Sequence, residues 1–123
     1  MQDLTMVKGR IKINLKALAI GQDLCVIITG GNKPHLGCVA LSVPRPGLAD
    51  PKVSSSTTSV LNLTGHKDDE AARRVSHLLS SRLNKNVAVI CGIHVENITP
   101  EEIKITFDLL KKLSQTLINN LTS

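Results

Sequence analysis

The sequence predicts an α+β fold: a mostly antiparallel β-sheet in ββββαβα order, with two helices packed on one face. Three observations predict it. The first half of the chain contains short apolar stretches separated by turn residues, two later stretches repeat apolar residues at helical spacing, and one apolar stretch lies between them. A chain of 123 residues is long enough for one core and too short for two, so we expect a single domain over residues 1–123.

The first expected strand, residues 10–17, alternates strictly between apolar and polar side chains. Such alternation is typical of a strand with one buried and one wet face. The polar set includes Lys12 and Lys16, which we place on the face away from the helices, in solvent or at a dimer contact. A second strand at residues 24–29 is apolar on both faces and forms a hairpin with the first, through a turn at residues 21–23.

Two more strands precede the first helix. A turn at residues 30–34 leads into a third strand at residues 36–43, which we expect the proline-rich residues 44–47 to end. A loop rich in proline and serine then runs to about Ser55, and a more polar strand covers residues 56–63. A connection of this length in so small a domain is often functional.

The two helical stretches differ in how clearly their ends are marked. The first has apolar residues at helical spacing over residues 71–83 and is preceded by three acids, which suit the first turn of a helix. The second has Thr99 as its N-cap, Pro100 in its first position and Glu102 completing a capping box. Between the helices, residues 87–93 predict a strand buried on both faces.

Composition limits the classes of partner. Apolar residues make up 41% of the chain and charged residues 20%, which is ordinary for a globular protein. The formal net charge of +5 is compatible with an anionic ligand, but the positive residues are scattered along the chain. Phe107 is the only aromatic residue, so the sequence offers no stacking platforms for bases. We therefore expect no nucleic-acid partner, and no membrane partner because no apolar stretch approaches the length of a membrane span.

The cysteines predict the compartment. Cys25, Cys38 and Cys91 each lie in an apolar, strand-like stretch. An odd number of cysteines without paired spacing argues against a disulfide framework or a zinc ribbon, and favours buried free thiols in a reducing compartment. The short apolar stretch at residues 15–20 lacks the flanks of a signal peptide. We therefore expect a cytoplasmic protein.

Three of the four histidines are predicted at the ends or starts of strands, where sheet edges and loops converge. His35 follows the turn at residues 30–34, His66 follows Thr-Gly, and His94 follows Cys-Gly-Ile. The fourth, His77, is predicted on the surface of the first helix. Three histidines can bind a metal, as in a zinc site with one open position, although metal ligands often come as close sequence pairs and these do not.

Residues 65–67, Gly-His-Lys at the start of the first helix, are suggestive of an anion site. A glycine lets a phosphate approach the backbone, the free N–H groups of a helix start point at it, and Lys67 adds charge. The structural alternative is equally simple, because a glycine commonly ends a strand. Moreover, Asp68, Asp69 and Glu70 suit any helix start and would repel a phosphate held close.

Three stretches are informative together: residues 30–37 (GGNKPHLG), residues 59–69 (ending in GHKDD) and residues 92–97 (GIHVEN). In this order and spacing they resemble the prenylated-flavin chaperone family, the small LpdD-like subunits that accompany UbiD-type hydroxyarylic acid decarboxylases. The resemblance extends from about Ile11 to the last helix.

The resemblance implies a non-catalytic chaperone that binds reduced prenylated flavin mononucleotide (prenylated FMN) and helps deliver it to a UbiD-type decarboxylase. It also implies a fold similar to that of the proteasome assembly chaperones, usually as a homodimer. The positions that match the family motifs, and so become candidates for the cofactor site, are His35, His66, Lys67, Asp68, Asp69 and His94. Arg45, in the loop expected after the third strand, is a further candidate for the phosphate.

Two other classes of function stay open. One is a small metal- or histidine-dependent enzyme that uses His35, His66 and His94. The other is an assembly chaperone that binds only protein. Since the chain has no Trp or Tyr, an isoalloxazine ring would rest on peptide planes, aliphatic side chains, a histidine, or a second flavin across a dimer axis.

Overall fold

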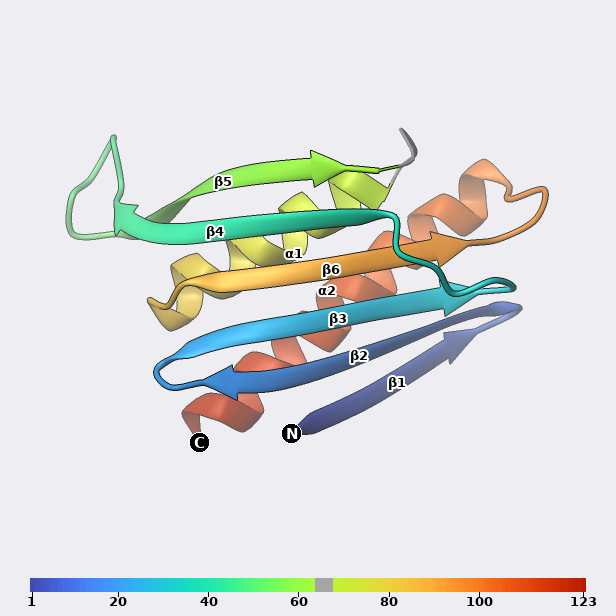
Figure 1. Cartoon of the computed structure of the whole chain (residues 1–123), viewed down its shortest axis with the longest axis horizontal. Coiled ribbons are helices and arrows are strands. Elements are labelled where there is room, and N and C mark those ends of the chain that lie inside the picture. Colours follow the sequence, from blue (N-terminus) through green and yellow to red (C-terminus); the bar gives the residue numbers. More distant parts are fainter. Residues whose placement is uncertain (64–67) are drawn as a thin grey trace.

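The computed structural model of the chain describes residues 1–63 and 68–123. In these residues six strands form one sheet in the order β1-β2-β3-β6-β4-β5, and two helices lie together on one face of it (Figure 1). The elements are β1 (Gln2–Lys8), β2 (Ile11–Ile20), β3 (Asp23–Gly31), β4 (Cys38–Pro46), β5 (Ser54–Asn62), α1 (Asp68–Leu83), β6 (Val87–His94) and α2 (Pro100–Thr122).

The sheet is antiparallel except at its centre, where β3 and β6 run parallel. The helix α1 packs on β4, β5 and β6, whereas α2 packs on β1 and β2 and against α1. The predicted fold class, a mostly antiparallel sheet with two helices on one face, is therefore confirmed. Neither helix in the described part of the chain has both the length and the hydropathy needed to cross a membrane.

The predicted order ββββαβα is short by one strand, because β1 precedes the first strand that was expected. In β1, Leu4 and Met6 are half-buried against the core, whereas Val7 faces solvent. Three apolar residues in a seven-residue stretch, two of them adjacent, are a weak strand signal. Pairing along the whole of β1 with β2 provides the stabilisation that the local sequence does not show.

The predicted end of the third strand is also wrong. Strand β4 continues to Pro46, so Arg45 lies in a strand and not in the following loop. The reason is the sheet topology: β6 pairs with β4 only as far as Ser42, and beyond it β4 has a neighbour, β5, on one side only. A proline that lacks an N–H is tolerated where a strand has no partner on that side.

The register of β2 is as predicted. Ile11, Ile13 and Leu15 are fully buried beneath the helices, whereas Lys12 is exposed and Lys16 half-buried on the other face. The expectation that the last strand is buried on both faces is wrong in this chain. Ala88 and Ile90, which face away from the helices, are only half-buried, because no helix covers that face.

Several strands end, and both helices begin, at the same end of the sheet. Strand β6 is parallel to β3 and antiparallel to β4, which in turn is antiparallel to β5. Consequently β3, β5 and β6 finish at the same end, where β4, α1 and α2 begin (Figure 1). Loops and helix starts from distant parts of the sequence meet there.

Candidate functional site

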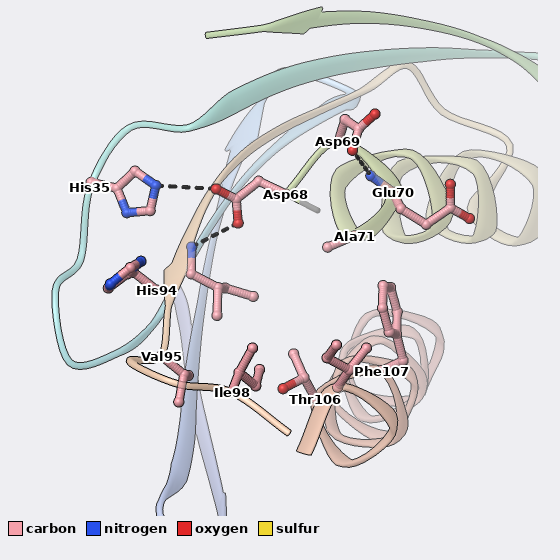
Figure 2. Close-up of a pocket in the computed structure, with 12 residues that line it drawn as sticks. His35, Asp68, Asp69, Glu70, Ala71, His94, Val95, Ile98, Thr106 and Phe107 are labelled. Carbon is pink, nitrogen blue, oxygen red and sulfur yellow. Dashed lines mark hydrogen bonds and ion pairs between the residues drawn. The ribbon is translucent and has the colours of Figure 1, made fainter. Parts of the chain in front are cut away.

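A pocket of about 570 Å³ lies at this end of the sheet (Figure 2). It opens between the end of β6, the start of α1 and the first turns of α2. We call it the strand-end pocket. Its lining residues are His35, Asp68, Asp69, Glu70, Ala71, Ile93, His94, Val95, Ile98, Ile103, Thr106 and Phe107.

A buried carboxylate connects the elements around the pocket. Asp68, the first residue of α1, is 4% exposed and accepts a hydrogen bond from the backbone N–H of Ile93 at 3.0 Å. Its second oxygen lies 3.1 Å from Nε2 of His35. The Nδ1 atom of His35 lies 3.1 Å from the backbone oxygen of Lys33. Both partners of this ring, the Asp68 carboxylate and the Lys33 carbonyl, are hydrogen-bond acceptors.

His94 forms the outer edge of the pocket. It ends β6, is exposed, and its ring centroid lies 6.4 Å from that of His35, with the two rings nearly perpendicular. The backbone around it is fixed by the loop after β3, because Asn32 N–H donates to the carbonyl of His94 at 2.7 Å. The side chain of Asn32 also accepts from the backbone N–H of Glu96 at 3.0 Å.

Two glycines allow the loop after β3 to pack directly against the backbone of β6. A Cβ atom on Gly92 would overlap the carbonyl group of His35, so the loop after β3 can cross β6 only where the strand has no side chain. Gly31 has a φ of +78°, and a Cβ there would overlap the carbonyl of His94. The glycines of the first and third sequence motifs are therefore required by close backbone approach.

The inner wall of the pocket is apolar and comes largely from residues that sequence reasoning did not select. Ile93 and Val95 contribute from β6 and the residue after it, Ile98 from the following loop, and Ile103 and Phe107 from α2. Phe107 points from α2 toward α1 in Figure 2. Phe107 is the single aromatic residue of the chain, which could have marked it as a contact for a flavin ring. The groups predicted to contact the ring did not include it.

The structure brings together four of the seven predicted site residues. His35, Asp68, Asp69 and His94 all line the strand-end pocket. In contrast to the buried Asp68, Asp69 is half-buried, and its carboxylate accepts the backbone N–H of Glu70 at 2.9 Å. His66 and Lys67 lie outside the described residues, so the prediction that all three histidines meet is observed for His35 and His94.

Arg45 is not brought to the pocket within this chain. It lies seven positions along β4 from Cys38, which at about 3.3 Å per residue places it roughly 23 Å away, near the opposite end of the sheet. Its guanidinium donates to the hydroxyl of Thr57 at 3.0 Å and to the carbonyl of Pro46 at 3.0 Å. The remaining histidine, His77, is exposed on α1 as predicted and hydrogen-bonds Ser56.

The described residues contain no cluster of metal ligands, and neither buried thiol has a lowered pKa. Within residues 1–63 and 68–123, no three His, Cys, Asp or Glu side chains converge closely enough to hold a metal ion. Cys38 and Cys91 are buried and free, and Cys25 is half-buried and free. Burial raises the pKa of both the Cys91 and the Cys38 thiols above the ordinary value, and the neighbouring Asp68 raises them further. Both thiols therefore remain protonated at neutral pH.

The fold and the pocket first define a class: an α+β protein with a fold of the proteasome-assembly-chaperone type and an apolar pocket at one sheet end. A chain in the crystal structure of a novel chaperone complex for yeast 20S proteasome assembly superposes on this chain with a TM-score of 0.62. The match covers 98% of this chain and 97% of that one at 15% sequence identity, so it shows the fold alone.

The sequence comparisons are more specific. Residues 7–122 match the prenylated flavin chaperone LpdD-like domain family. The chain is also 28% identical over 100 residues to protein LpdD of Lactiplantibacillus plantarum, a match that covers 81% of this chain and 70% of LpdD. The chain therefore belongs to the LpdD-like prenylated flavin chaperone family.

Proposed function

We propose that this protein is a non-catalytic cytoplasmic chaperone that binds reduced prenylated FMN in the strand-end pocket and delivers it to a UbiD-type decarboxylase. The observation that carries the proposal is the pocket itself, in a chain of this family. Its lining includes residues of all three sequence motifs, and its volume of about 570 Å³ lies within the range of small-molecule sites.

The lining of the pocket fits a flavin ring. Its inner wall of Ile93, Ile103 and Phe107 provides an apolar surface for the isoalloxazine, and Phe107 provides the aromatic contact. His35 and His94 provide hydrogen-bonding groups at the rim, where the polar edge of the ring would lie. Asp68 acts through His35 by fixing the orientation of its imidazole, so we assign it a positioning role.

Prenylated FMN supplies the decarboxylation chemistry once it reaches the partner enzyme. This chain's own residues bind the cofactor, orient its ring and exclude water from one side of it. Cys38 and Cys91 are buried, and burial raises the pKa of both thiols above the ordinary value. The cytoplasmic location accords with their being free.

We infer a homodimer that forms through the face of the sheet opposite the helices. The strand registers align outward-facing residues in rows across this face: Ile27, Ile90, Val39 and Leu61 form one row, and Leu18, Cys25, Ala88 and Leu41 the next. Leu61 is 71% exposed and Leu41 48% exposed in the single chain. A contiguous apolar surface of this kind usually marks a protein contact.

Native mass spectrometry of the protein co-produced with a prenylated-flavin synthase tests the proposal. We expect the mass of a dimer carrying prenylated FMN, and no turnover of hydroxyarylic acids by the isolated protein. A stoichiometric metal instead of the flavin would favour the histidine-dependent enzyme. A protein that carries no small molecule, but captures the decarboxylase, would favour the protein-only chaperone.

A further inference from the structure

A second groove, of about 360 Å³, lies between the two helices. We call it the interhelical groove. Val75, Leu78 and Leu110 form its apolar sides, and Phe107 lines both this groove and the strand-end pocket. The guanidinium of Arg74 lies 4.5 Å from the centroid of the Phe107 ring.

The two spaces share Phe107 as a lining residue, and together we call them the furrow. On α2, Phe107, Lys111 and Ser114 follow at intervals of four and three residues, so they lie on one face of the helix. Seven residues at 1.5 Å rise separate Phe107 from Ser114, or about 10 Å. A flexible polyol chain that leaves a ring in the strand-end pocket can follow the furrow over that distance.

Ser114 marks the floor of the interhelical groove as polar. The residue is fully buried, and its hydroxyl is the one buried side-chain oxygen or nitrogen without a hydrogen-bond partner in residues 1–63 and 68–123. A buried hydroxyl without a partner costs free energy, roughly 1–3 kcal/mol in general. A ligand atom that pairs with it would remove that cost, so the groove is suited to a polar group.

The two ends of the furrow differ in charge. The strand-end pocket is lined by three carboxylates, Asp68, Asp69 and Glu70. The interhelical groove is lined by Arg74 and Lys111 and by one carboxylate, Asp108. Arg74 gives one N–H to Glu70 at 2.8 Å, but a guanidinium has five N–H donors. A phosphate dianion is therefore repelled at one end of the furrow and attracted at the other.

We propose that the interhelical groove is the phosphate subsite of the bound ligand, with Lys111, Arg74 and the Ser114 hydroxyl as its donors. The proposal rests on the proposed function, because it assumes a phosphate-bearing flavin whose ring lies in the strand-end pocket. It differs from the sequence-based expectation that Lys67, at the start of α1, contacts the phosphate. The carboxylates at that helix start are the physical reason for the difference.

The test compares two probes, reduced prenylated FMN and the same compound after its phosphate has been removed by phosphatase. Binding to the full chain is measured anaerobically for the unaltered protein, Lys111→Glu and Lys112→Glu. The last is a matched control, since Lys112 is the exposed neighbour on α2 and does not line the groove. We expect Lys111→Glu to weaken binding of the phosphorylated probe about ten- to a hundredfold. Binding of the dephosphorylated probe should be unchanged, and Lys112→Glu should bind both probes like the unaltered protein.

Ser114→Ala provides a second measurement. It should weaken binding of the phosphorylated probe several-fold and leave the melting temperature of the free protein unchanged or raised, because an unpaired buried hydroxyl has been removed.

Three outcomes separate the ideas. Equal binding of the two probes by the unaltered protein would overturn the subsite and leave the flavin function standing. Loss of phosphate preference in Lys67→Ala and His66→Ala, but not in Lys111→Glu, would place the phosphate at the start of α1. Failure of both probes to bind would overturn the proposed function itself.

Discussion

The two helices begin with the same local signal and use it differently. Both have acids in the first turn: Asp68, Asp69 and Glu70 in α1, and Glu101 and Glu102 in α2. An acid there favours a helix start because it faces the positive end of the helix dipole. By sequence alone the acids at the two starts have the same explanation.

The start of α2 is built for stability. Thr99 accepts the N–H of Glu102, and the Glu102 side chain accepts the N–H of Thr99, which completes the capping box that the sequence predicted. The carboxylate also receives two hydrogen bonds from Arg10, at 2.6 and 2.8 Å. This contact ties α2 to the turn between β1 and β2.

The start of α1 forms part of the strand-end pocket. Asp68 turns inward and binds His35 and the backbone of Ile93, so its charge orients pocket groups. The helix dipole favours an acid at both starts. The role of each acid depends on its partner distant in the sequence, which is Arg10 for Glu102 and His35 for Asp68. Three substitutions test this comparison.

Gly92→Ala should have the largest effect. The added methyl group would meet the backbone of His35, which cannot move without breaking the hydrogen bonds of the loop after β3. We expect the free energy of unfolding to fall by about 3 kcal/mol, together with a loss of flavin binding. Chemical denaturation measures the first effect. An unchanged unfolding midpoint would contradict the close approach of the two segments.

Asp68→Ala should be the next most damaging. It leaves the backbone N–H of Ile93 without its partner and frees the His35 ring, and we expect a loss of about 2 kcal/mol in stability. Asp69→Ala is the matched control, because its carboxylate bonds only to the adjacent Glu70 N–H in the described residues, and it should cost less. Asp68→Asn keeps an acceptor and should fall between the two. Equal losses for Asp68→Ala and Asp69→Ala would show that the inward contacts do not matter.

Glu102→Gln should have the smallest effect, and one that depends on pH. The hydrogen bonds from Arg10, followed by that from the backbone of Thr99, lower the pKa of Glu102 to about 2 from an ordinary value of 4.5. A lowered pKa in the folded state means that the carboxylate stabilises the fold above about pH 4.5, and that this contribution disappears as the pH falls through 2. The melting temperature of Glu102→Gln should therefore be lower than that of the unaltered protein at pH 7 and equal to it near pH 2.

Glu101→Gln, with an exposed side chain beside Glu102, is the control for that series. It removes only a first-turn charge near the helix dipole, so it should lower the melting temperature at pH 7 less than Glu102→Gln does. A gap between Glu102→Gln and the unaltered protein that stays constant from pH 7 to pH 2 would contradict the assignment of the low pKa to Glu102.

The elements that were predicted well are those with a strong local pattern. The alternation of β2 placed Ile11, Ile13 and Leu15 in the core, and the capping box fixed the start of α2. The motif residues His35, Asp68 and His94, predicted as site candidates, all line the strand-end pocket. Weak or context-dependent signals failed: β1 needs its partner strand, and the prolines of β4 are tolerated only because β6 stops short of them.

Local patterns in the sequence were enough to predict the α+β class and the register of the strongest strand, because periodicity and capping act over a few residues. The grouping of three motifs came instead from the resemblance to a family. Packing between distant segments, by contrast, places Arg45 far from the pocket and Phe107 in the lining of two spaces. It also buries Ser114, whose hydroxyl has no hydrogen-bond partner in residues 1–63 and 68–123. These features depend on strand order and on how closely two helices approach. Both are set by packing between segments distant in the chain, where no local pattern records them.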